Sequence, residues 1–330
     1  MKITVRLPNW MGDTVMAVPA LRAIREKYPE AQVLLAGPWV DLLAGQGLGD
    51  VLVGYPRAWT GRLRVADTVR DFRSDTVVLL PSSFEAAAAA VYWRGRRRIG
   101  YATDGRRWLL TDALPLPSPR LHQVDEYRQL AARLGADTAG REPRLTAPKP
   151  DADSRRRVRD LLRECGAGED RPRIGVHLGA AYGPAKVWAR ERVVEFCRHA
   201  PERGVIPVLL GAPSDAAAAA GVLREVKAAS LVGRDSPDLL PAVLTEIAVL
   251  VSGDTGVAHL AAALGTPVVA LFGPTDPALS APLGSAAVMR HPVPCAPCFY
   301  RACPIDHPCM RGILADAVGV EIDALLARTA

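Results

Sequence analysis

The stretch from Val251 to Pro277 reads VSGDTGVAHLAAALGTPVVALFGPTDP and places an acid, a hydroxyl, a glycine and an imidazole between apolar runs. The apolar residues up to Gly253 predict a buried strand, and VAHLAAALG predicts the helix that follows it. PVVALFG then predicts a second strand. A strand, a helix and a strand in this order are typical of a βαβ unit in a parallel sheet. This stretch therefore decides the fold class.

The same alternation occurs through both halves of the chain. KITVRL, AQVLLAG, DTVVLLP and RRIGYA predict strands in the first half, and RIGVHLG, VIPVLLG, ASLVG and AVLVSG predict strands in the second. Segments of helical spacing, such as TVMAVPALRAIREKYP, lie between them. The pattern predicts α/β, doubly wound parallel sheets of the Rossmann-like class, covered by helices on both faces. Their ligands should bind at the carboxyl ends of the strands.

The alternation is interrupted once, between about residues 143 and 172, by a segment rich in proline and charge around one amphipathic helix. A length of 330 residues also favours two domains of about 150 residues each. We therefore expect an N-terminal Rossmann-like domain at 1–150, a connection at 151–170 and a C-terminal Rossmann-like domain at 171–330. The last domain includes a cysteine-rich segment at 295–309 and a C-terminal helix.

Composition limits the location and the partners. No run of about 20 uncharged apolar residues occurs, and MKITVRLPNW is too polar for a secretory segment, so we expect a cytoplasmic protein. The formal charge of +6 arises from 41 basic and 35 acidic residues and hints at an anionic substrate or surface. Only five of the basic residues are lysines.

The residues between the two strands of the opening stretch favour a phosphate site. Asp254, Thr255 and Gly256 stand at the end of a strand and at the first turn of the helix that carries His259. Unpaired backbone N–H groups and the positive end of a helix bind phosphate, and a glycine lets the ligand approach closely. The alternative is structural, with Asp254 capping the helix and His259 buried in the core.

A second loop has similar properties. LGAAYGPAKVW, from Leu178 to Trp188, follows the strand RIGVH, and its small residues Gly179, Ala180 and Ala181 leave the backbone accessible. Lys186 supplies a cation near the start of the next helix, where a lysine is electrostatically unfavourable unless an anion is near. The alternative is an ordinary surface lysine. Because both loops follow strands of one domain, they are expected to converge on one ligand.

The first strand of the chain ends at LPNWMGDTV, which places Asp13 directly after Gly12 at the start of a helix. A carboxylate at this edge of a doubly wound sheet can take a proton from an attacking hydroxyl group. Capping of the helix is the competing interpretation.

The densest basic segment suits an acidic acceptor or the anionic face of a membrane. Its members are Arg94, Arg96, Arg97, Arg98, Arg106 and Arg107. A solvated arginine-rich loop is the alternative. Because no nucleic-acid recognition module is visible, we expect no nucleic-acid partner.

Four of the six cysteines lie within fifteen residues, in CAPCFYRACPIDHPC. Zinc prefers four thiolate or imidazole ligands, so a structural zinc site is one interpretation and a set of free thiols is the other. The candidate ligands are Cys295, Cys298, Cys303 and Cys309, with His307 as a substitute.

Several of these segments together resemble a known family. PNWMGD, LPSSF at 80–84, LGAAYGPAKVW and SGDTGVAHLAAALGTPVVALFGPTDP are similar, in this order, to the ADP-heptose:lipopolysaccharide heptosyltransferases of glycosyltransferase family 9. The loop at 178–183 carries Ala180 and Ala181 in place of paired threonines, which resembles the heptosyltransferase II branch. The resemblance implies a GT-B fold, with two Rossmann-like domains facing a central cleft. It implies no role for the cysteines.

The resemblance also implies a reaction. An inverting displacement that requires no metal cofactor would move heptose from ADP-L-glycero-D-manno-heptose to a heptose of the anionic lipopolysaccharide inner core. The membrane partner would be the cytoplasmic surface of the inner membrane. In this comparison Asp13 matches the base and Lys186 the cation that neutralises the leaving diphosphate.

The remaining site residues follow from the same resemblance. The donor site would contain Gly179, Ala180, Ala181, Lys186, Asp215, Asp254, Thr255, Gly256 and His259, with Asp215 on the ribose. The acceptor site would contain Asn9, Trp10, Ser82, Ser83, Arg97, Arg98 and Arg106. Two alternatives stay open: a family 9 transferase with another nucleotide sugar or acceptor, and a noncatalytic binding protein on the same fold.

Overall fold

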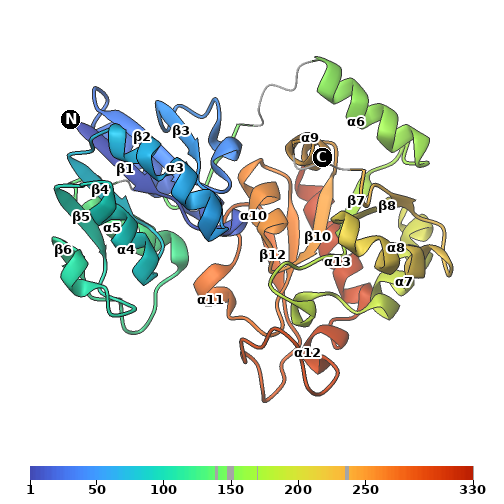
Figure 1. Cartoon of the computed structure of the whole chain (residues 1–330). Helices are drawn as coiled ribbons and strands as arrows, with labels where there is room; N and C mark the ends of the chain where they lie inside the picture. Colours follow the sequence, from blue (N-terminus) through green and yellow to red (C-terminus); the bar gives the residue numbers. More distant parts are fainter. Residues whose placement is uncertain (138–139, 147–151, 169, 235–237, 330) are drawn as a thin grey trace. The chain divides into compact units, whose positions relative to one another are not determined.

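The computed structural model describes residues 1–330 except 138–139, 147–151, 169, 235–237 and 330. The chain divides into two compact units, Met1–Leu145 and Thr146–Ala330, here called unit 1 and unit 2. Each unit contains one six-stranded parallel sheet (Figure 1). Over these described ranges, every helix is too short or too polar to cross a lipid bilayer.

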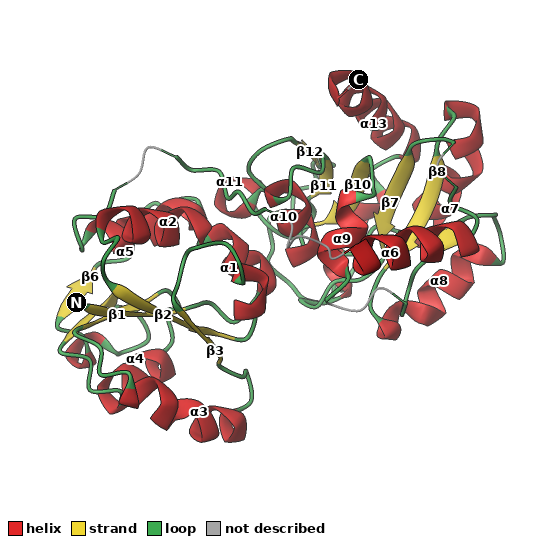
Figure 2. Cartoon of the chain, turned by 90° about the horizontal axis from the view of Figure 1, so that it is seen from above, coloured by secondary structure: helices red, strands yellow, loops and turns green. Residues whose placement is uncertain are grey.

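Unit 1 is a three-layer α/β structure with the strand order β3-β2-β1-β4-β5-β6. Figure 2 shows α3 and α4 on one face of the sheet and α1, α2 and α5 on the other. The strands are β1 (Lys2–Arg6), β2 (Gln32–Gly37), β3 (Val51–Gly54), β4 (Thr76–Leu79), β5 (Arg97–Tyr101) and β6 (Asp112–Leu114). The helices are α1 (Met11–Met16), α2 (Val18–Lys27), α3 (Trp59–Asp71), α4 (Phe84–Tyr92) and α5 (Gln123–Ala132).

Unit 2 has the strand order β12-β11-β10-β7-β8-β9. The strands are β7 (Arg173–His177), β8 (Ile206–Leu210), β9 (Ala229–Ser230), β10 (Val249–Gly253), β11 (Val268–Leu271) and β12 (Ala286–Met289). The helices are α6 (Ala152–Glu164), α7 (Arg190–His199), α8 (Ala216–Leu223), α9 (Leu240–Thr245), α10 (Gly256–Ala263), α11 (Pro277–Ser280), α12 (Pro308–Arg311) and α13 (Ala315–Thr329). Helix α6, from the expected connection, packs against α9 within this unit.

The buried cores explain why these segments form strands and helices. Strands β1, β4, β7 and β10 are covered on both faces, so nearly all of their residues are buried. The sequences of β4 and β10 are mainly apolar, as is typical of such strands, whereas β1 also buries the polar residues Thr4 and Arg6. In unit 2 one core cluster joins β7 and β10 to α7 and α13, and the Trp188 ring at the end of the 178–188 loop is buried in it. The Trp188 indole N–H also donates to the Ile313 carbonyl over 3.0 Å.

Both sheets follow the same connection rule. In each unit the chain builds outward in one direction for three strands and then returns to the opposite side of the first strand. The reversal lies between β1 and β4 in unit 1 and between β7 and β10 in unit 2. A ligand crevice in an open parallel sheet forms outside the carboxyl ends of the two strands at this reversal. The loops after these four strands are therefore the expected binding loops.

The predicted strands are present, but one expected helical segment is divided. The segment from Thr14 to Pro29 contains the end of α1 and the whole of α2, and the two helices meet at Ala17. Pro19 lies in the first turn of α2, where a missing backbone N–H costs little but where it cannot continue the preceding helix. Helix α1 is therefore a short element, and it carries Asp13.

Candidate active site

A cavity of about 260 Å³ lies at the reversal point of unit 1. The turn after β1 contributes Asn9, Trp10 and Asp13, and the loop after β4 contributes Ser82 and Ser83. These loops are adjacent because β1 and β4 pair in register, with Arg6 opposite Leu79. The cavity thus collects five residues of the expected acceptor and base set.

Asp13 lies in the first turn of α1, three residues after the N-cap residue Trp10. Asp13 is therefore not the N-cap residue of α1, which was the alternative interpretation. Its carboxylate accepts a hydrogen bond from the hydroxyl of Tyr127, a buried residue of α5 that also lines the cavity. Burial raises the pKa of Tyr127 well above its usual value, and the charge of Asp13 raises it further. Tyr127 consequently remains a hydrogen-bond donor to Asp13.

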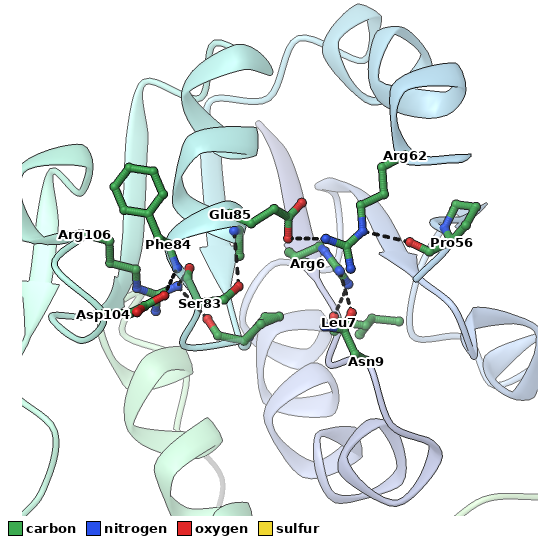
Figure 3. A network of polar contacts seen from close by, with 12 residues as sticks. Arg6, Leu7, Asn9, Pro56, Arg62, Ser83, Phe84, Glu85, Asp104 and Arg106 are labelled. Atoms are coloured by element: carbon green, nitrogen blue, oxygen red, sulfur yellow. Dashed lines mark hydrogen bonds and ion pairs between the residues drawn. The ribbon is translucent and has the colours of Figure 1, made fainter. Parts of the chain in front are cut away.

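Two buried arginines brace the loops that line this cavity (Figure 3). Arg6, the last residue of β1, donates to the Leu7 carbonyl and, over 2.7 Å, to the Asn9 side-chain oxygen. Its guanidinium also lies 4.6 Å from the centre of the Tyr55 ring. The Asn9 side chain is thereby held by a charged partner within the turn that leads to Asp13.

Arg106 is fully buried and bonds main-chain carbonyls (Figure 3). Its Nη1 donates to the carbonyls of Pro81 at 2.7 Å and Ser83 at 2.9 Å, and its Nε donates to Tyr101 at 2.9 Å. Burial lowers the pKa of Arg106 to about 10, which leaves it charged at neutral pH. Arg106 therefore holds the loop that carries Ser82 and Ser83. Because its side chain is fully buried, it does not face a bound acceptor substrate.

Arg97 and Arg98 lie at the amino end of β5, whereas Tyr101 at its carboxyl end lines the cavity. Four residues of strand separate the two ends by about 13 Å. Arg97 pairs with Asp112 at 2.6 Å, and Arg98 donates to the carbonyl oxygens of Gly95 and Leu109. Among the described residues, Arg97 and Arg98 are not part of the cavity lining. Parallel strands place all their amino ends at one end of the sheet, and the cavity lies at the carboxyl ends.

In unit 2 the loops after β7 and β10 meet at an ion pair. Lys186, in a 3₁₀ turn at Pro184–Lys186, places its Nζ 2.5 Å from Oδ2 of Asp254. Thr275, after β11, donates its hydroxyl to the same Oδ2 at 2.8 Å. His259 on α10 lies with Nε2 at 3.8 Å from Oδ1 of Asp254. Lys186, Asp254, Thr275 and His259 therefore form one cluster, here called the donor cluster.

The electrostatics of the donor cluster favour an ionised acid. Burial alone would raise the pKa of Asp254, but the nearby His259 ring and the charge of Lys186 outweigh burial and lower the pKa to about 2. Close packing of backbones positions the pair, since a Cβ added to Gly253 would lie 2.1 Å from the Lys186 carbonyl oxygen. Asp254 is thus an ion-pair partner, and Lys186 is a largely buried cation whose side chain is 12% exposed.

The other expected donor residues surround this cluster at the same edge of the sheet. Thr255 is the N-cap residue of α10, and its Oγ1 lies 2.9 Å from Ser252 Oγ, so its hydroxyl points back toward β10. Gly256 is the first residue of α10. Asp215 packs against Gly179, where a Cβ would meet its carboxylate at 2.3 Å. Ala180 is partly exposed and Ala181 is exposed on the loop between Gly179 and Lys186.

The cysteine segment, residues 295–309, brings some of its thiols close together. Burial raises the pKa of Cys309, and the nearby thiols of Cys295 and Cys303 raise it further. The backbone N–H of His307 donates to Cys303 Sγ at 3.2 Å. In the part of the chain that the structure describes, three or more metal-binding side chains do not gather into a metal site. The expected zinc site therefore stays a prediction.

Sequence reasoning did not identify two important side chains. Tyr127 lies more than a hundred residues from Asp13, and its own surroundings carry no motif. Thr275 lies inside the stretch from Val251 to Pro277, and its place shortly after β11 is a usable signal, because β11 and β10 are parallel neighbours whose carboxyl ends lie together.

Beside Tyr127, Arg120 forms two hydrogen bonds to the buried acid Glu126, at 2.6 and 2.8 Å, on the wall of the cavity.

Comparison with known proteins agrees with this geometry. The model of glycosyltransferase family 9 (heptosyltransferase) matches residues 62–308. Lipopolysaccharide heptosyltransferase 2 of Salmonella typhimurium is 28% identical over 315 residues, which cover 87% of each chain. The solved structure of Escherichia coli ADP-heptose lps heptosyltransferase II has a TM-score of 0.82 and 26% identity, and covers 100% of this chain and 99% of that one.

A second solved structure, of the E. coli heptosyltransferase WaaC with ADP-2-deoxy-2-fluoro heptose, has a TM-score of 0.70. It is 20% identical and covers 98% of this chain and 99% of that one, so the likeness concerns the fold. The two six-stranded parallel sheets, each with one reversal of strand order, have the GT-B fold of these glycosyltransferases. The chain belongs to glycosyltransferase family 9, the heptosyltransferases.

Proposed function

We propose that the protein transfers L-glycero-D-manno-heptose from its ADP-activated form to a heptose of the lipopolysaccharide inner core. The observation that carries the proposal is the donor cluster, in which Lys186 and Asp254 lie 2.5 Å apart at the reversal point of unit 2. Two related proteins support the choice of substrates: one is named lipopolysaccharide heptosyltransferase 2, and one holds an ADP-heptose analogue.

The proposed chemistry is a single displacement with inversion. The carboxylate of Asp13 takes the proton of the acceptor hydroxyl, and the acceptor oxygen forms a bond to the anomeric carbon of the donor. The bond between that carbon and the phosphate oxygen breaks, and ADP leaves with the electron pair. Lys186 neutralises the charge that develops on the diphosphate. These steps use only side chains of this protein and require no metal cofactor.

The proposed binding residues divide between the units. In unit 2 the donor contacts are assigned to Gly179, Ala180, Ala181, Asp215, Thr255, Gly256 and His259, with Asp215 on the ribose hydroxyls. In unit 1 the acceptor contacts are assigned to Asn9, Trp10, Ser82 and Ser83, which line the cavity beside Asp13. Arg106 acts through the loop that it braces. Arg97 and Arg98 are left out because they lie at the other end of β5.

The test is a transfer assay with a panel of nucleotide sugars and a heptose-containing core acceptor. We expect turnover with ADP-heptose, and Asp13→Ala should lower kcat by about 10²–10⁴-fold while ADP still binds. The exposed acid Asp71 is the matched control, because Asp71→Ala should leave turnover unchanged. Turnover with a uridine sugar but not with ADP-heptose would overturn the substrate assignment. Full turnover by the Asp13 variant would overturn its role as the base.

The acceptor is anchored in a membrane, and exposed aromatic rings next to the cavity support a peripheral location at the cytoplasmic face of the inner membrane. Trp108 is 73% exposed and its ring lies 6.1 Å from that of Phe84, which follows the cavity residue Ser83. The exposed Arg107 is next to Trp108. Aromatic rings with a neighbouring arginine suit the interface of an anionic bilayer.

A flotation experiment with anionic vesicles tests this surface. The protein should be recovered in the vesicle fraction, and Trp108→Ala should lower the amount recovered there. Equal recovery would count against this surface.

We also propose a structural metal at the cysteine segment. The nearness of the Cys295, Cys303 and Cys309 thiols supports it, as does His307 Nε2, which is buried and has no hydrogen-bond partner in the described chain. Binding would require the thiols to move closer together. Zinc near one per chain in protein purified without added metal, lowered by Cys295→Ser but not by Cys165→Ser, is the expected result. A content well below one would remove the proposal.

A further inference from the structure

The donor cluster is short of positive charge for its proposed task. A leaving ADP carries charge on both phosphates, but the carboxylate of Asp254 already compensates the one lysine in the cluster at 2.5 Å. The low pKa of Asp254 means that this compensation persists at neutral pH. An anion with two phosphates is better stabilised when a second cation reaches it, and arginine can bind phosphate through two N–H groups at once.

The cysteine segment is tied to two of the loops around this cluster. The main chain of Phe299 forms both connections: its carbonyl accepts from the Tyr182 hydroxyl, and its N–H donates to the Pro274 carbonyl at 2.7 Å. Tyr182 belongs to the loop of Lys186, and Pro274 directly precedes Thr275 of the donor cluster. The cysteine segment therefore fixes the relative position of these two loops.

Arg301 is held against the same loop two residues later. Its carbonyl accepts a hydrogen bond from the N–H of Ala185 at 3.1 Å. The approach is close, because a Cβ added to Gly183 would lie 2.4 Å from that carbonyl oxygen. Gly183 also has a φ of 150°, which few side chains tolerate. The backbone of Arg301 is thus placed by the fold of the loop that carries Lys186.

The side chain of Arg301 lies against the aromatic ring that Lys186 also contacts. Its guanidinium carbon lies 5.3 Å from the centre of the Tyr182 ring, and Lys186 Nζ lies 4.6 Å from the same centre. Two cations therefore contact one aromatic ring, whose negative π faces attract both. Arg301 is exposed, so its charge is available to a ligand, whereas that of Lys186 is compensated.

We propose that Arg301 is a second cation of the donor site, which the cysteine segment presents to the diphosphate of the nucleotide sugar beside Lys186. The inference rests on the proposed ADP-sugar donor and extends it to a segment that the proposed reaction does not otherwise use. It gives the cysteine segment a function whether its thiols are free or bind a metal, because the contacts of Phe299 and Arg301 are made by the main chain.

The test compares the binding of ADP and of adenosine by calorimetry, because adenosine lacks both phosphates. Arg301→Gln should weaken ADP binding about tenfold and leave adenosine binding unchanged. Arg198→Gln is the matched control, since Arg198 is an exposed arginine of the same unit near the end of α7. Both variants should melt at the temperature of the parent chain, because Arg301 is exposed.

Unchanged ADP binding in Arg301→Gln would overturn the inference. An equal loss for ADP and adenosine would also overturn it, because the residue would then act on the shape of the loop and not on phosphate. Neither result would affect the proposed transfer reaction, which the Asp13 variant tests. A parent chain that binds no ADP would instead overturn the proposed donor.

Discussion

Nζ of Lys186 lies 2.5 Å from Oδ2 of Asp254, and the two side chains are only 12% and 6% exposed. The pair joins a loop after β7 to the turn after β10, about seventy residues further along the chain. Lys186 is therefore not an ordinary surface lysine, and Asp254 is an ion-pair partner and not the N-cap of α10, a position that Thr255 occupies. Two predictions from local sequence become one site through this contact.

Asp254→Asn should destabilise the protein, because it leaves the buried charge of Lys186 without its counterion. Breaking a buried pair by removing one partner costs about 3 kcal/mol or more. Asp323→Asn is the control: Asp323 pairs with Arg203 in the same unit, but its side chain is 50% exposed, so the expected loss is below about 1 kcal/mol. Urea unfolding of both variants measures the difference. Equal losses would contradict the structural weight given to the buried pair.

Tyr127→Phe should impair turnover without weakening donor binding. The Tyr127 hydroxyl donates a hydrogen bond to the Asp13 carboxylate, and such a hydrogen bond favours the charged form of the carboxylate. We expect a fall in kcat of about tenfold, and an acid limb of the pH–rate profile displaced to higher pH. Tyr28→Phe also removes a hydroxyl that bonds a carbonyl of unit 1, and it should leave the profile in place. An undisplaced acid limb in the Tyr127 variant would contradict the contact.

Arg106→Lys should disturb acceptor binding more than donor binding. Lysine cannot reproduce the planar set of three hydrogen bonds to the Pro81, Ser83 and Tyr101 carbonyls. The loop that carries Ser82 and Ser83 should shift, and the KM for the acceptor should rise about tenfold while the KM for the donor stays constant. Arg107→Lys is the control, since Arg107 is exposed. A similar change in both KM values would indicate general loss of structure.

His177 should make the stability of unit 2 depend on pH. Burial lowers the pKa of His177 to about 4, although the charge of Asp215 opposes this. The unfolded chain, with an ordinary histidine pKa of about 6.5, therefore binds a proton that the folded chain resists. Stability should fall as pH decreases from about 6.5 to about 4, by about 2 kcal/mol between pH 7 and pH 5. His177→Asn should reduce this difference, and unfolding at the two pH values measures it.

The extent to which the fold follows from sequence depends on burial. Strands such as β4 and β10 are recognisable because both faces are covered, which favours apolar residues at most positions. Strand β6 has only three residues, all partly exposed at an edge, and no periodicity can be read from it. The boundary between α1 and α2 is not evident from the pattern, because apolar spacing continues across Ala17, whereas Pro19 lacks the backbone N–H that a continuous helix would need.

The positions of the candidate site residues were predictable where these residues follow the end of a strand. Lys186, Asp254 and Asp13 could be placed because parallel strands gather their following loops at one edge. The Tyr127 contact and the burial of Arg106 could not be predicted, because each depends on the packing of distant elements. Arg97 shows the same limit. It lies in a cluster of arginines in the sequence, but strand β5 separates it from the cavity residue Tyr101 at the other end of that strand.

The identical strand order of the two sheets has a consequence for how such enzymes diversify. Each sheet is formed by one continuous half of the chain, with its own core and its own set of loops at the reversal point. Recombination near residues 145–146 would therefore exchange an intact folding module for another. In the proposed reaction, a hybrid gene of this kind would inherit its acceptor preference from one parent and its sugar-nucleotide preference from the other.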